Sequence, residues 1–111
     1  MTEIVKFKEN RDYRRVYGRG KSFVSPALVT YVLKNKTKNI RYGITTSKKI
    51  GKAVRRNRSK RIIRAAFDGL SSKIPPGYDF VFVARTKTST LKSTDIEACM
   101  KKQLKKAGVF E

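Results

Sequence analysis

The strongest candidate for chemistry in this sequence is a run of cationic side chains from Arg55 to Arg64. Six of these ten residues are Lys or Arg, and none is Asp or Glu. The whole chain of 111 residues has 28 Lys and Arg against 8 Asp and Glu, a formal charge of +20. Such an excess in one small domain predicts a polyanionic partner. A membrane surface is the rival partner, but it requires a helix with large exposed apolar residues.

The cationic run predicts an amphipathic helix from about Lys52 to Gly69. At 100° per residue, Arg56, Lys60 and Arg64 form one row, beside Asn57 and Arg61. Another side of the helix is apolar and predicted to pack on a sheet, through Val54, Ile62, Ala65 and Ala66, with Ile63 and Phe67 at its border.

Like charges three or four residues apart destabilise a helix by about 0.2–0.5 kcal/mol per pair, or about 1–2 kcal/mol in total here. A solvated surface helix is one interpretation, although such a face normally includes glutamates. Binding of phosphates along the row is the other, and it is favoured because contacts with phosphates would outweigh the repulsion. Asn57 adds a donor and an acceptor suited to RNA.

A second candidate site combines tyrosines with cations. Tyr13 and Tyr17 stand four residues apart in a predicted helix from Asn10 to Tyr17, and Tyr31 lies on a predicted strand. Aromatic residues at this spacing commonly belong to a core. Aromatic rings among cations such as Arg14 also form platforms for single-stranded nucleic acid, where stacking contributes about 1–3 kcal/mol per base. Both interpretations remain open at this point.

The elements that must position these residues predict an α+β sandwich. Asn10 is expected to cap the first helix and Gly18 to end it. The strand "SPALVTYVLK" leads through a polar hairpin connection, "NKTKN", to "IRYGITTS". The strand "YDFVFVAR" is apolar on both faces and therefore expected to be central, with Asp79 paired to a cation. A last helix is expected to begin at a Thr94–Glu97 capping box and to end at Gly108. Its core-facing residues, at helical spacing, are predicted to be Ile96, Met100, Leu104 and Ala107.

The sequence lacks the residues that several classes of function require. There is no histidine, the acidic residues are scattered, and Cys99 is the single cysteine, which argues against nucleophilic catalysis, an acid–base pair or a zinc site. The sequence has no phosphate-binding-loop motif, so we expect no small-molecule substrate. No apolar segment reaches the roughly 20 residues of a membrane span, and the N-terminus has no signal-peptide pattern, so we expect a cytoplasmic protein without a membrane partner.

The segment "SKKIGKAVRRNRSKRIIRAAF", Ser47 to Phe67, resembles the signature of the bacterial ribonuclease P protein component. "RDYRRVYGRGKSF" and "YDFVFVAR" are also similar to segments of that family, so the resemblance covers nearly the whole chain as one domain, residues 1–111. It implies a small two-layer α+β sandwich, like the second domain of a small-subunit ribosomal protein. That fold has three helices and a mixed four-stranded sheet in the order αβββαβα. It also contains a left-handed βαβ crossover, against the usual right-handed preference.

The resemblance also implies a function and sites. The family's protein binds a catalytic RNA and the 5′ leader of precursor tRNA, which the RNA removes with Mg²⁺ at its own active site; the protein alone is inactive and binds no cofactor. The residues implied to bind the catalytic RNA (RNase P RNA) are Lys48, Lys49, Arg55, Arg56, Asn57, Arg58, Lys60, Arg61 and Arg64. Those implied to bind the leader are Tyr13, Arg14, Tyr17 and Tyr31. A structural RNA-binding protein, such as a small ribosomal protein, is the alternative.

Overall fold

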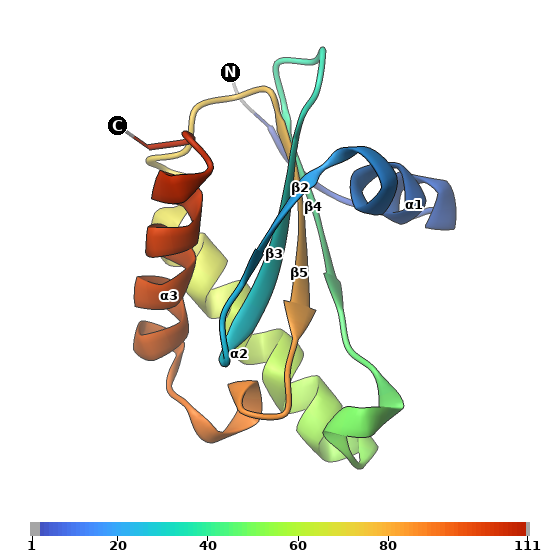
Figure 1. The fold of residues 1–111 in the computed structure, drawn as a ribbon, viewed down its shortest axis with the longest axis vertical. Coiled ribbons are helices and arrows are strands. Elements are labelled where there is room, and N and C mark those ends of the chain that lie inside the picture. Colours follow the sequence, from blue (N-terminus) through green and yellow to red (C-terminus); the bar gives the residue numbers. More distant parts are fainter. Residues whose placement is uncertain (1–2, 111) are drawn as a thin grey trace.

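A computed structural model describes residues 3–110 and shows a mixed sheet with helices against both of its faces (Figure 1). The elements in chain order are β1 (Ile4–Lys6), α1 (Asn10–Arg19), β2 (Lys21–Val24), β3 (Leu28–Lys34), β4 (Ile40–Thr45), η1 (Lys48–Ile50), α2 (Ala53–Ser71), β5 (Tyr78–Ala84), η2 (Thr88–Thr90) and α3 (Ser93–Lys106). Helices α2 and α3 cover one face of the sheet, and α1 lies against the other (Figure 1). No helix among these residues is long and apolar enough to cross a bilayer.

The sheet has five strands in the order β1-β4-β5-β3-β2, rather than the predicted four. The additional strand, β1, pairs in parallel with β4, from Ile4 opposite Ile40 to Lys6 opposite Tyr42. Backbone hydrogen bonds from Phe7 N–H to Tyr42 O (2.7 Å) and from Ile40 N–H to Glu3 O (2.9 Å) extend the pairing. Three residues are too few to show an alternating pattern, so the sequence carries no signal for this strand.

Strand β5 is central, as its apolar faces predict, but its position makes the expected hairpin wrong. It pairs antiparallel to β3 and parallel to β4, so β3 and β4 are not neighbours. The connection from Asn35 to Asn39 instead spans the start of β5: Asn35 N–H donates to Gly77 O (2.8 Å), and Gly77 N–H donates to Asn39 O (3.1 Å). The sequence of such a polar connection does not show whether the two strands that it joins are neighbours or are separated by a later strand.

The main core lies between the sheet and helices α2 and α3. Three of the four residues predicted to face the core from α3 are confirmed, since Ile96, Met100 and Leu104 are fully buried. The fourth, Ala107, is half-buried at the cap that follows the helix. Helix α3 begins at Ser93, so its capping contact is the Lys92 N–H donated to Asp95 Oδ2 (3.1 Å), not the predicted Thr94–Glu97 pair. Gly108, with φ of 82°, follows the end of the helix as expected.

The apolar side of α2 is rotated from the predicted one. Ile63, Ala66 and Phe67 are fully buried, whereas Ala65 is exposed and Val54 is 75% exposed. The first buried residue of the helix is Ser59, so its first turns carry no core face at all. The sequence pattern therefore predicted the position of the helix in the chain correctly. It did not predict which side of the helix packs on the sheet, or that this packing begins only at Ser59.

A second, smaller core lies under α1 on the opposite face. It contains Phe7, Val16 and Val81, with Tyr13 and Tyr31 among the half-buried residues packed on it. The helix is longer than predicted: Asn10 is its first residue after a cap at Glu9, and it continues past Gly18 to Arg19, with Gly20 as its C-cap. A Cβ on Gly20 would lie 2.9 Å from Val32 O of β3, so this glycine lets the end of the helix lie close to the sheet.

Candidate nucleic-acid interface

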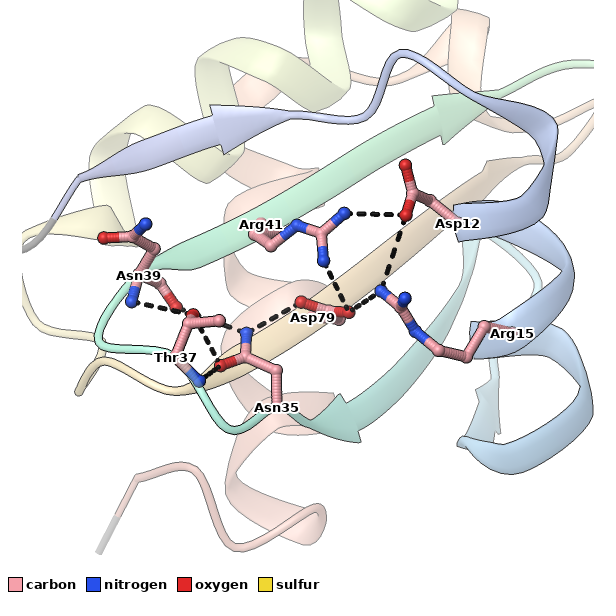
Figure 2. A network of polar contacts seen from close by, with 7 residues as sticks. All are labelled: Asp12, Arg15, Asn35, Thr37, Asn39, Arg41 and Asp79. Carbon is pink, nitrogen blue, oxygen red and sulfur yellow. Dashed lines mark hydrogen bonds and ion pairs between the residues drawn. The ribbon is translucent and has the colours of Figure 1, made fainter.

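A buried polar network fixes α1 on the sheet (Figure 2). The Asp79 side chain, which is 0% exposed, accepts hydrogen bonds from Arg15 Nη2 and Asn35 Nδ2, both at 2.7 Å. Arg41 donates to Asp12 Oδ1 at 2.7 Å, and its other terminal nitrogen lies 3.9 Å from Asp79 Oδ2. These contacts join α1 to β4 and β5, and they confirm that Asp79 pairs with cations.

The network also decides which cations of α1 are available to a ligand. Arg15 is committed to Asp79, and the exposed Arg11 pairs with Glu9. Arg14 is exposed and forms no ion pair within residues 3–110. Of the arginines of α1 outside its last turn, Arg14 is therefore the one free to meet an anion.

Tyr13 lies across β4 at Gly43, which is buried. A Cβ on Gly43 would fall 2.4 Å from Tyr13 Cε1, so only glycine leaves room for the ring there. The ring also meets Phe7 edge-on, with 5.4 Å between centroids. Burial is the main cause that raises the pKa of the Tyr13 hydroxyl above its usual value of 10.0.

The other two tyrosines form an edge-on pair in which one ring is more exposed than the other. Tyr17 packs edge-on against Tyr31, with 4.9 Å between ring centroids, and the Tyr17 and Thr45 hydroxyl oxygens are 3.3 Å apart. Tyr17 is 40% exposed, whereas Tyr31 is half-buried beneath it. Tyr17 therefore presents the accessible ring, and Tyr31 supports it from the small core.

An open groove of about 730 Å³ runs between α1 and the end of β4. Its lining residues are Asn10, Tyr13, Arg14, Tyr17, Ile44, Thr45, Thr46 and Lys60. The structure thus brings three of the four predicted leader residues together, and Tyr31 lies behind them. Thr45, Thr46 and Asn10 were missed, because nothing in the sequence marks a threonine at a strand end as facing a groove.

The cationic row of α2 borders this groove. A neighbouring hollow of 290 Å³ is lined by Lys6, Ile44, Asn57, Lys60, Arg61 and Arg64. Ile44 and Lys60 line both depressions, so the groove and the cationic row form one continuous surface. Lys6, in the unpredicted strand β1, was missed for the same reason as the strand.

The remaining predicted RNA-binding residues surround that surface. Lys48, Lys49 and Arg55 are exposed at and after the turn before α2. Arg56 is half-buried and donates from Nη1 to Gly51 O at 2.8 Å. Arg58 lines a further hollow towards Lys92, which shares Arg61 with the hollow beside the groove. The positively charged surface therefore wraps around the first half of α2.

None of the cations of α2 forms an ion pair in the part of the chain that the structure describes. Their mutual repulsion is not relieved within the protein, which favours the phosphate-binding interpretation over a solvated face. Within the same residues, no three His, Cys, Asp or Glu side chains come together as metal ligands. The two buried carboxylates, Asp12 and Asp79, are occupied by arginines.

Comparison with known proteins decides the family. The model of the ribonuclease P family matches residues 1–108. The chain belongs to the ribonuclease P protein family. The ribonuclease P protein component of Clostridioides difficile is 44% identical over 103 residues, covering 92% of this chain and 90% of the relative. That of Pelotomaculum thermopropionicum is 45% identical over 102 residues, covering 92% and 91%.

Solved structures of ribonuclease P proteins share the fold. The Staphylococcus aureus protein has a TM-score of 0.82 at 36% identity, covering 96% of this chain and 97% of its own. The Thermotoga maritima protein has a TM-score of 0.79 at 30% identity, covering 91% and 96%. The predictions of an α+β ribonuclease P protein fold and of a ribonuclease P protein subunit are therefore confirmed, apart from the number of strands.

Proposed function

We propose that the chain binds the RNA of ribonuclease P through α2 and holds the 5′ leader of precursor tRNA in the groove between α1 and β4. The observation that supports this arrangement is that the groove and the cationic row of α2 adjoin each other at Lys60 and Ile44. An RNA bound along α2 and a strand lying in the groove would meet at Lys60. The protein would thereby align the leader with the RNA that cuts it.

Each part of the surface suits its ligand. The cations of α2 neutralise phosphates of a folded RNA, and Asn57 can reach a 2′-hydroxyl or a base edge. In the groove, the exposed Tyr17 ring offers a stacking surface for a leader base, and Arg14 a partner for its phosphate. Thr45 and Thr46 add hydroxyls that can bond to sugar or phosphate oxygens. Tyr13 and Gly43 fix the groove wall rather than its opening.

In the holoenzyme, the RNA subunit carries the catalysis. Within residues 3–110, no three His, Cys, Asp or Glu side chains come together that would hold Mg²⁺. We therefore assign the Mg²⁺ ions to the RNA, and to the protein only the binding and orientation of the substrate. The reaction is the removal of the leader, which gives the mature 5′ end of tRNA in the cytoplasm.

The experiment that tests this function measures affinities of the reconstituted holoenzyme for precursor tRNA and for mature tRNA. Tyr17→Ala is expected to weaken precursor binding by about 1–3 kcal/mol, the contribution of one stacked base. Arg14→Ala should weaken it as well. Arg11→Ala, one turn of the same helix away, is the matched control because Arg11 does not line the groove.

Mature tRNA has no leader, so its affinity should stay the same in all three variants. Equal losses for both substrates would show that the groove does not hold the leader. Unfolding temperatures serve as the check on the fold. They should hardly change for Arg14→Ala, because that side chain is exposed, and fall slightly for Tyr17→Ala, which loses its edge-on contact with Tyr31.

A further inference from the structure

A second cationic surface lies at the opposite edge of the sheet from the row of α2. We call it the β2-edge surface; its cations are Arg19, Lys21, Lys34, Lys87, Lys102 and Lys106. The row of α2 borders Lys6 of β1 and Ile44 of β4, at the other end of the strand order. At about 4.8 Å per strand, the two edges are separated by roughly 15–20 Å. An RNA strand lying along α2 would have to turn away from the helix to reach both.

Two adjoining hollows form the β2-edge surface. The first, of 240 Å³, includes Arg19, Lys21 and Lys34 together with the half-buried rings of Phe23 and Tyr78. The second, of 400 Å³, begins at Val24, the residue after Phe23, and includes Lys87, Lys102 and Lys106. The hollows therefore follow each other along β2, and Lys106 of the second precedes Ala107 of the first.

Buried hydrogen bonds hold this edge rigid. Gln103 of α3 donates from Nε2 to Phe23 O and Leu28 O, each at 2.9 Å, and accepts from Thr30 Oγ1 at 2.6 Å. Ser25 Oγ accepts from the backbone N–H of Leu28 at 3.1 Å and lies 3.0 Å from Cys99 Sγ. The backbone that carries Lys102 and Lys106 is thus set in a fixed register against β2.

Helix termini explain only some of these charges. Arg19 and Lys106 lie in the last turns of α1 and α3, where cations stabilise a helix. Lys21, Lys34 and Lys102 have no such role. Within residues 3–110, none of the six cations forms an ion pair. The one carboxylate lining either hollow is Asp95, which accepts the Lys92 N–H.

We propose that the β2-edge surface is a second RNA-binding site, which holds a different segment of RNA from the one along α2. The cations bind its phosphates, and the rings of Phe23 and Tyr78 favour an unpaired strand at the first hollow. This inference builds on the proposed function, since it gives the RNA a second contact. With contacts at both sheet edges, the protein clamps two RNA segments at a fixed separation.

The first test neutralises the surface. One variant carries glutamine in place of four lysines of the surface, Lys21, Lys34, Lys102 and Lys106. The matched control carries glutamine in place of four other lysines, Lys8, Lys36, Lys38 and Lys73, so both variants lose the same charge. All eight side chains are exposed, and the control residues line neither surface. Binding of a transcribed bacterial ribonuclease P RNA is measured from 0.15 to 1 M salt. The slope of log affinity against log salt should fall by about 3 in the first variant and much less in the control.

The second test locates the RNA. In a Cys99→Ser background, a hydroxyl-radical reagent is attached at Ala98→Cys beside the β2-edge surface, or at Val54→Cys on α2. Both positions are exposed. The two reagents are expected to cut the same RNA at different sets of nucleotides. Thermal unfolding of each variant checks that the fold persists.

The outcomes separate this inference from the proposed function. An unchanged salt slope, with no cuts from position 98 and strong cuts from position 54, would overturn the second RNA site. It would leave the β2-edge surface to an acidic protein partner and the proposed function intact. If neither reagent cuts the RNA and neutralising α2 also leaves its affinity unchanged, the proposed function fails as well.

Discussion

Replacing Asp79 with asparagine is expected to loosen α1 while leaving the main core folded. Asp79 accepts bonds from Arg15 and Asn35, one on each carboxylate oxygen, at 2.7 Å. An asparagine presents an NH₂ group to one of these two donors, so at least one buried bond is lost. A bond to a charged group contributes about 1.5–3 kcal/mol. The Arg15 side chain is 36% exposed and can turn to water, so we expect a loss of about 2 kcal/mol.

For a domain of this size, such a loss lowers the unfolding temperature by roughly 8 °C. The assay combines calorimetry with amide hydrogen exchange. Exchange should accelerate in α1, which rests on the small core, more than in α3, which rests on the main core. Precursor tRNA should bind the reconstituted holoenzyme more weakly, because α1 provides one wall of the groove.

The matched control is Asp68→Asn, which removes the same charge from an exposed position of α2 that is without an ion pair among residues 3–110. It should leave both the unfolding temperature and precursor binding unchanged. An Asp79→Asn protein as stable as the wild type would refute the argument that the network holds α1. Uniformly faster exchange in α1 and α3 would refute the argument that the effect is local.

Three further predictions address other parts of the structure. Arg61→Ala with Arg64→Ala should lower the salt slope of RNA binding by about 1.5 and leave stability equal or slightly higher, because repulsion is relieved; an unchanged slope would make the row a solvated face. Gly43→Ala should destabilise the fold by about 1–3 kcal/mol, measured by denaturant unfolding, because its methyl group overlaps the Tyr13 ring, whereas Gly18→Ala, in open space within α1, should stabilise it slightly. Because the pKa of Tyr13 is raised in the folded state, stability should decline as the pH rises above about 10, and Tyr13→Phe should decline less in unfolding experiments between pH 8 and 11.

The elements with strong periodicity could be predicted from the sequence. Strand β5 is apolar on both faces, and Phe80, Val81 and Phe82 are indeed fully buried at the centre of the sheet. The burial of Ile96 and Met100 followed from helical spacing in the same way. The tyrosines of α1 were placed beside cations correctly, but the sequence did not separate the exposed ring of Tyr17 from the buried side of Tyr13. That difference depends on how the helix is rotated on the sheet.

The contacts that orient α1 could not be predicted, because their partners are distant in sequence. Arg15 and Asp79 are 64 positions apart. The sequence shows that residues of opposite charge are present, but not which of them pair. The continuity of the groove with the cationic row has the same origin. Thr45 and Lys60 lie on different elements, and their proximity depends on the crossover from β4 through α2 to β5.

The central place of a late strand has a consequence for how the chain folds during synthesis. Before Tyr78–Ala84 leaves the ribosome, the only native neighbour available to β3 is β2, and the only one available to β4 is β1. In each pair the edge that β5 later covers is open, and open strand edges promote aggregation. The high positive charge of the nascent segment opposes such association between copies. Insertion of β5 then closes both edges at once, and it delivers Asp79 to α1 in the same step. Folding should therefore be slow until that strand is available and cooperative afterwards.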